Sequence, residues 1–435
     1  MKRRSFLKYM GIGATTALAA PSSTSAQTRE QGSKQTSPPK RYKEWIAARI
    51  ARLISTDHID AFLNSAPNNQ WAQFDPELGY VLKDSIQRDG MDGSHCIYRF
   101  NPGGERKTIN FADRACRINT YGNSFTQCHQ VNDGETWQEY LAAHLGEPIR
   151  NLGVGGHGVF QAYRRMLRVE NGDARAENIV LNIWGDDHHR SVTPWRGLLI
   201  NYMGHEQMFH GSPWSYLEVN LQSGEFEEAP NPCPTPESLY RLQSADYVYD
   251  TFGRHPVIQL TAMREGVSDV EQGTIRKLAD WAGYRFDFSD GASRASSAKT
   301  LWDIVAYRST LHLLEQCKSF AEANRKNLLV LLTHGGGRVA HFASGGSKNE
   351  YDRSVIECLQ KHKIPYVDSL DKHRDDFQQF RITPQEYVDR YYIGHYNPMG
   401  NHFLAYAIKD AVVDWLNPKP ITYRDKASIM DFNDG

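Results

Sequence analysis

Apolar and polar positions along this chain follow two alternating periods, one typical of strands and one typical of helices. Short apolar runs predict five strands, at 116–121, 148–154, 178–184, 327–334 and 364–370. Apolar residues at helical spacing predict helices at 135–145, 159–168, 301–325 and 403–416. Strands that alternate with helices favour an α/β fold in which helices cover both faces of a central parallel five-stranded sheet.

Two regions fall outside this alternation. Residues 41–115 begin with a helical pattern from about residue 42 and continue with mixed glycine, proline and charge, which predicts an N-terminal extension with short strands. An insertion of roughly 195–300 separates the third and fourth strands, far longer than the usual connection of about 2–6 residues. Its composition fits substrate recognition and a purely structural subdomain or lid equally well. The main domain is expected to span 116–418, followed by a tail at 419–435.

The N-terminus has the layout of an export signal. A basic start with Lys2, Arg3 and Arg4 precedes an uncharged run from Tyr9 to Ala20, too short for a span of about 20 apolar residues. Small residues then lead to Ala26, which predicts a signal peptide at 1–26 and a polar linker at 27–40. The segment "RRSFLK" resembles a twin-arginine signal. We therefore expect the twin-arginine export machinery as a partner, a periplasmic or secreted location, and no membrane attachment after cleavage.

Composition adds limits but no function. The 435 residues are 40% hydrophobic and 23% charged, which is ordinary for a globular protein. The net charge is -1, and removal of 1–26 takes away four positive charges, so no electrostatic signature of nucleic-acid binding is present. Six cysteines show no metal-binding spacing, and an exported protein could pair them in any of 15 ways.

Four polar, glycine-rich segments carry the candidate chemistry. Ligands of open parallel sheets bind beyond the carboxyl ends of the strands. "YGNSFT", "NLGVGGHG" and "WGDDHHR" follow the first three strands, and "GHYNPMGNH" precedes the closing helix. Each segment has a simpler interpretation: a turn with a helix cap, closely packed glycines, or a solvated loop. The "DDHH" run could also ligate Zn or Mn, but adjacent side chains point apart, so we expect no metal.

The order of these segments is similar to that of the SGNH/GDSL hydrolase superfamily. "YGNSFTQ" resembles its first block with Asn123 in place of the usual aspartate, "NLGVGGHG" its second, and "GHYNPMGNHFLAYAI" its last. The resemblance covers roughly 116–168, 178–190 and 390–416. It implies a three-layer flavodoxin-like fold and no cofactor. It also implies Ser124 as the nucleophile, His395 as the general base and Gly156 as an oxyanion-hole glycine.

The sequence departs from this family in the third block. The family usually has Asn-Asp there, and the asparagine donates to the oxyanion, whereas this chain has Asp186 and Asp187. An ionised aspartate can only accept hydrogen bonds. Three interpretations stay open: Asp186 is protonated, His188 donates instead, or the reaction is not ordinary ester hydrolysis.

A second departure lies just before the histidine. The family usually has an aspartate three residues earlier to orient the imidazole, and Tyr392 occupies that position here. The nearest upstream acid is Asp389, which could reach the ring only from an altered loop. A Ser-His dyad oriented by a backbone carbonyl is the alternative, and we favour it.

These features together predict an exported SGNH-type serine hydrolase, a carbohydrate O-acyl esterase that acts on a glycan or small-molecule substrate. One alternative is a glycoside hydrolase on the same fold, with Asp186 and Asp187 as acid and base and Ser124 reduced to substrate binding. Another is a carbohydrate-binding protein without catalysis, since 11% aromatic residues suit sugar stacking as well as a packed core.

Overall fold

The structure is a computed structural model that describes residues 41–64, 71–199 and 211–424. The expected signal peptide at 1–26, the linker at 27–40 and most of the expected tail lie outside the described residues. Within the described ranges, no helix combines the length and the apolar character needed to cross a bilayer.

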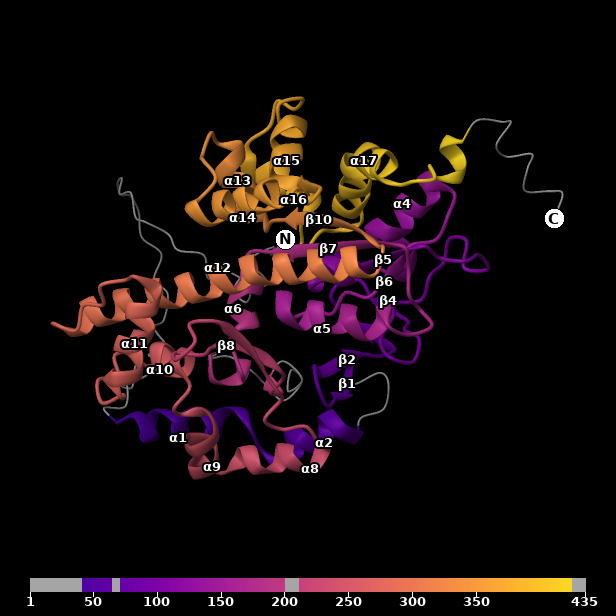
Figure 1. Cartoon of the computed structure of the whole chain (residues 1–435). Helices are drawn as coiled ribbons and strands as arrows, with labels where there is room; N and C mark the ends of the chain where they lie inside the picture. Colours follow the sequence, from indigo (N-terminus) through magenta and orange to yellow (C-terminus); the bar gives the residue numbers. More distant parts are fainter. Residues whose placement is uncertain (1–40, 65–70, 200–210, 425–435) are drawn as a thin grey trace, which may run out of the picture.

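A parallel five-stranded sheet forms the centre of the main domain, as the alternating pattern predicts (Figure 1). Its strands are β5 (Ile118–Tyr121), β6 (Arg150–Asn151), β7 (Asn178–Trp184), β10 (Asn327–Thr333) and β11 (Tyr366–Asp368). The strands lie in the order β11-β10-β7-β5-β6. Counted from the β6 edge, this is the flavodoxin-like order 2-1-3-4-5. Its topological switch point, where ligands bind, lies at the carboxyl ends of β5 and β7.

The central strand β7 supplies side chains to two separate cores. Ile179, Leu181 and Ile183 lie in the core beneath α5 and α12, and Val180 lies in the opposite core with α4 and α17. This division follows from the two-residue period of a strand, whose successive side chains point to opposite faces. Both faces of the sheet are therefore buried.

Helices cover the two faces and complete the three layers (Figure 1). One face carries α4 (Trp137–Leu145), α13 (Gly336–Ala343), α15 (Ser369–Phe377), α16 (Pro384–Tyr391) and α17 (Pro398–Trp415). The other face carries α5 (Val159–Glu170), α6 (Asp187–Ser191) and α12 (Gly291–Ala323), with α14 (Glu350–Lys361) packed against α12.

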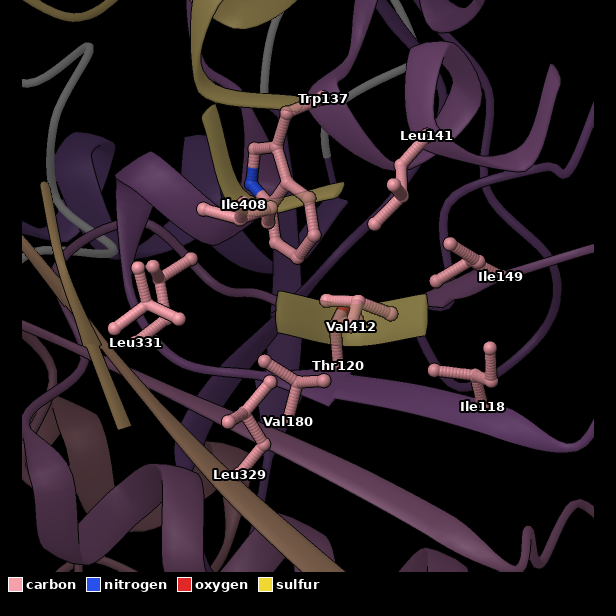
Figure 2. Close-up of a pocket in the computed structure, with 11 residues that line it drawn as sticks. Ile118, Thr120, Trp137, Leu141, Ile149, Val180, Leu329, Leu331, Ile408 and Val412 are labelled. Atoms are coloured by element: carbon pink, nitrogen blue, oxygen red, sulfur yellow. The ribbon is translucent and has the colours of Figure 1, made fainter. Parts of the chain in front are cut away.

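A small apolar cavity lies between the sheet and the helices α4 and α17 (Figure 2). Its volume is about 10 Å³, and its lining includes Trp137, Leu141, Val180, Leu331 and Ile408. A buried water needs roughly 10–15 Å³ and two to four polar partners. The cavity is therefore a packing gap in the core and offers no room for a substrate.

The N-terminal extension forms two helices and two hairpins. These are α1 (Tyr42–Leu53), α2 (Thr56–Asn64), the pair β1 (Ala72–Asp75) and β2 (Gly79–Leu82), and the pair β3 (Ser85–Gln87) and β4 (Cys96–Tyr98), with η1 (Met91–Gly93) in the second hairpin. Helix α1 packs on the insertion: the Tyr42 hydroxyl donates to the Gly253 carbonyl at 2.9 Å, and Trp45 Nε1 donates to Glu265 at 2.9 Å.

The described part of the insertion holds one hairpin and several helices. It consists of η3 (Arg196–Leu198), β8 (Tyr216–Val219), β9 (Phe226–Ala229), α8 (Pro236–Leu239), η5 (Tyr240–Gln243), α9 (Ala245–Phe252), α10 (Pro256–Arg264) and α11 (Gln272–Ala282). It ends where α12 begins at Gly291, ten residues before the helix expected at 301–325. The helix starts there because the Asp290 side chain accepts from the N–H groups of Ala292 and Ser293.

Candidate functional site

Ser124 lies directly beyond the carboxyl end of β5, at the first residue of α3 (Ser124–Gln127). The chain turns at Gly122, whose φ is +150° and where a Cβ would lie 2.5 Å from the Asn182 carbonyl oxygen. Asn123 then caps the helix, because its Oδ1 accepts from the Phe125 N–H at 2.7 Å. The turn and the helix cap expected at this segment are both present, and they place Ser124 at the switch point of the sheet.

His395 approaches Ser124 from the loop between α16 and α17. Its Nε2 lies 2.7 Å from the Ser124 Oγ. The loop ends at Asn397, which caps α17 by accepting from the Gly400 N–H at 2.9 Å. The structure thus brings the expected nucleophile and the expected base, 271 residues apart, into hydrogen-bond contact.

The surroundings of His395 favour the neutral imidazole. Burial holds the pKa of His395 well below its usual value, and the nearby His129 and Arg190 lower it further. The ring centroids of His129 and Phe125 each lie 5.0 Å from that of His395. A neutral imidazole is the form that can take a proton from a serine hydroxyl.

Gln130 occupies the position next to the second ring nitrogen of His395. Its Oε1 lies 3.0 Å from His395 Nδ1 and accepts from the His395 backbone N–H at 2.9 Å. The remaining amide group, Nε2, donates to the Asp89 carbonyl at 3.2 Å. The imidazole of His395 is therefore contacted by an amide at Nδ1.

Asp389, the candidate third acid, does not occupy this position, and neither does the backbone carbonyl of the expected dyad. Helix α16 continues to Tyr391, and Asp389 lies on its exposed side, where it accepts from Gln385 Nε2 at 2.8 Å. Tyr392, at the family's aspartate position, is buried and donates its hydroxyl proton to the His334 carbonyl at 3.1 Å. Asp389 points to solvent because it lies on the exposed face of this helix.

Two backbone N–H groups near the nucleophile are suited to an oxyanion. Among the described residues, neither the Ser124 N–H nor the Gly156 N–H donates to another protein group. Gly155 makes the close approach to the nucleophile, since a Cβ there would lie 3.4 Å from the Ser124 Cβ. Its own N–H is used by Gln127 Oε1 at 2.8 Å, so Gly156, with φ +89°, is the better candidate donor.

Asp187 is buried and fully engaged. Its Oδ2 accepts from the Trp184 N–H at 2.8 Å and from the Asn123 amide, and its Oδ1 accepts from Arg190 Nη1 at 3.0 Å. Burial raises the pKa of Asp187 to about 7. These contacts join the end of β7 to the turn that carries Ser124.

The contacts of Asp186 and His188 do not favour either residue as the oxyanion donor. The Asp186 carboxylate is paired with Arg190 Nη2, which leaves it an acceptor. The His188 ring is buried against Tyr307 and Tyr351, with ring centroids 4.9 and 4.1 Å away, and burial holds its pKa well below the usual value. Helix α6 directs His188 into this aromatic cluster, a position that does not favour it as an oxyanion donor.

The four side chains of the "DDHH" run diverge. The two carboxylates contact Arg190, His188 enters the aromatic cluster, and His189 Nε2 lies 2.7 Å from Asp303 Oδ1. In the part of the chain that the structure describes, no three His, Cys, Asp or Glu side chains converge as metal ligands. The six cysteines all lie in the described ranges, and none of them forms a disulfide there.

Sequence reasoning missed three residues around the base: Gln130, His129 and Asp89. His129 Nε2 lies 2.8 Å from Asp89 Oδ2, and its ring packs on Trp71 at 4.5 Å. The only signal was that Gln130 lies six residues after Ser124 and just beyond the first block, because a buried amide has no sequence pattern of its own. No protein-family model matches the chain, and no curated protein matches it in sequence.

Proposed function

We propose that the chain is an exported serine hydrolase of the SGNH type that removes acyl groups from a carbohydrate. The observation that carries the proposal is the contact of 2.7 Å between Ser124 Oγ and His395 Nε2 at the switch point of the sheet. A serine hydroxyl is a weak nucleophile and needs an adjacent base of this kind.

The proposed reaction proceeds in two steps. His395 Nε2 takes the proton of the Ser124 hydroxyl as Oγ attacks the ester carbonyl carbon, and then gives that proton to the leaving sugar alcohol. A water molecule then attacks the acyl carbon while His395 takes its proton; the acyl C–Oγ bond breaks, and His395 returns that proton to Ser124 Oγ as the free acid leaves. The N–H groups of Ser124 and Gly156 donate to the oxyanion in both steps.

The carbohydrate substrate follows from the export signal and from the resemblance to the SGNH/GDSL superfamily. We favour acyl transfer to water over glycoside hydrolysis because the carboxylates of Asp186 and Asp187 are both held by Arg190. An acid and base pair for glycoside hydrolysis must flank the scissile bond, and the buried Asp187 cannot do so.

The test compares Ser124→Ala with the native protein on a nitrophenyl acyl ester and on acetylated polysaccharides. We expect the loss of nearly all ester cleavage, with unchanged folding. Ser344→Ala is the matched control, since Ser344 is exposed at the end of α13 and bonds only the Ala340 carbonyl. Glycan cleavage that survives Ser124→Ala and is abolished by Asp186→Asn would overturn the esterase in favour of the glycoside hydrolase. Glycan binding without any cleavage would favour the binding protein.

A further inference from the structure

We propose that Gln130 is the positioning residue that fixes the tautomer of His395, in the role that an aspartate usually fills. This inference rests on the proposed function, because it assigns a role within the same site. The Gln130 side chain contacts His395 and Asp89 and, among the described residues, makes no hydrogen bond to Ser124, so it acts through the imidazole.

Two backbone groups determine which end of the Gln130 amide faces His395. The His395 backbone N–H can only donate, and it lies 2.9 Å from the amide, so the atom that it meets must be the oxygen. At the other end, the Asp89 carbonyl can only accept, and it lies 3.2 Å from Nε2. Both contacts agree on one amide orientation.

That orientation determines where the imidazole carries its proton. The same Oε1 lies 3.0 Å from His395 Nδ1. Because this oxygen can only accept, a hydrogen bond between the two atoms requires a proton on Nδ1. The Nε2 of the neutral ring is then unprotonated and can accept the Ser124 hydroxyl proton across 2.7 Å.

The loop that carries Gln130 is held from several sides. Gln130 and Cys128 both have left-handed backbones, with φ of +76° and +59°. The buried Arg106 fixes this shape, because Nη1 donates to the Gln127 and Cys128 carbonyls at 2.6 and 2.9 Å and Nη2 to the Val131 carbonyl at 2.6 Å. The Gln130 N–H donates to the Tyr98 hydroxyl at 2.8 Å. A conformation held in this way persists despite its local cost.

A neutral amide orients the ring without adding a negative charge beside it. The titratable and charged groups that face His395 are Ser124, His129 with its partner Asp89, and Arg190. Burial, together with His129 and Arg190, holds the pKa of His395 well below its usual value, although Asp89 acts in the opposite direction. The acid limb of the kcat/KM profile should therefore lie below pH 6.5. A carboxylate at position 130 would stabilise the imidazolium and move that limb to higher pH.

The test measures kcat, KM and pH profiles of Gln130→Ala and Gln130→Glu on the nitrophenyl ester. Gln130→Ala removes the acceptor, so kcat should fall by about 10–100-fold while KM changes by less than about threefold. Gln130→Glu keeps an acceptor for both N–H groups of His395 and loses the bond to Asp89. Its acid limb should move up by about 1–2 pH units. Gln385→Ala, on the exposed side of α16, is the matched control and should match the native enzyme.

The outcomes separate this inference from the proposed function. If Ser124→Ala abolishes activity but Gln130→Ala keeps kcat within twofold, Gln130 does not position the base and the hydrolase stands. If Ser124→Ala stays active, the proposed function itself fails. Urea unfolding shows whether Gln130→Ala is folded. If Gln130→Ala is not folded, the pH of the acid limb of Gln130→Glu is the test. An acid limb at the native pH overturns the inference.

Discussion

The side-chain amide of Asn123 donates a hydrogen bond to the buried carboxylate of Asp187, and this contact ties the turn after β5 to the end of β7. From the resemblance to the SGNH/GDSL superfamily, an aspartate would be expected at position 123. Two ionised carboxylates in such a contact would repel each other strongly away from water. The asparagine therefore suits a site in which the partner is already a buried acid.

Asn123→Asp should destabilise the folded protein. The new carboxylate would keep the helix-capping oxygen but would face Asp187 without a donor, so the free energy of unfolding at pH 8 should drop by about 2–4 kcal/mol. The loss should shrink toward pH 5, where one of the two carboxyls holds a proton. Urea unfolding at both pH values measures this. The exposed Asn171→Asp serves as the control, and an equal effect of both substitutions would contradict the expected repulsion.

Asp187 should also give the folding stability a pH dependence. Burial raises its pKa to about 7 in the folded protein, from an ordinary value of 3.8. Between about pH 4 and 7 the folded state therefore binds more protons than the unfolded state. The contribution of Asp187 is fully present below about pH 4 and is lost as the pH rises through about 7.

Asp187→Asn removes this titration, so the free energy of unfolding should change less steeply between pH 4 and 7 than in the native protein. Urea unfolding across that range measures the slope. Asp389→Asn, on an exposed helix face, should keep the native slope. A native slope in Asp187→Asn would show that Asp187 does not titrate in this window.

Much of the fold was predictable because the central strands are buried on both faces. The apolar runs at 178–184 and 327–334 match β7 and β10 within one residue. The expected strand at 148–154 shrinks to the two residues of β6, at the sheet edge. Beyond it, the Leu152 and Val154 N–H groups still donate to the Thr120 and Gly122 carbonyls at 2.9 Å, but regular strand pairing does not continue. The first turns of α12, "GASRASSAKT", lack an apolar stripe, so the sequence pattern did not predict them as helical.

Only those residues of the site that lie in the short sequence blocks could be predicted. Ser124 and His395 stand out because each lies within one of the quoted blocks, and the sheet topology brings the two blocks together. Gln130 could not be predicted, because its role depends on a left-handed loop shaped by Arg106 from a distant segment. Helix α16 directs Asp389 toward solvent, and helix α6 directs His188 into the core. Neither orientation could be predicted from the spacing of residues in the sequence.

Export should depend on the arginine pair itself. A general secretory signal needs only positive charge at its start, which lysine keeps, whereas a twin-arginine signal needs both guanidinium groups. Replacing Arg3 and Arg4 together with lysine should leave full-length, uncleaved protein inside the cell. Cell fractionation and the mass of the N-terminus measure this, with Lys2→Arg as the control. Normal cleavage and export of the double variant would indicate the general secretory route.

Gly156→Ala should separate a backbone requirement from a catalytic one. Gly156 has φ +89°, a conformation that costs a residue with a side chain about 1–2 kcal/mol. Relief of that strain would rotate the peptide and displace an N–H that we assign to the oxyanion hole, where loss of one donor costs about 100–1000-fold in kcat. We expect kcat to fall by at least about tenfold, with a smaller change in KM.

The matched control for this substitution is Gly345→Ala. Gly345 has φ +87° and open space around a Cβ, so it carries the same backbone cost away from Ser124. Both variants should lose about 1–2 kcal/mol of unfolding free energy, but only Gly156→Ala should lose kcat on the nitrophenyl ester. Equal stability losses with native kcat in both variants would remove Gly156 from the oxyanion hole and leave the Ser124 N–H as its assigned donor.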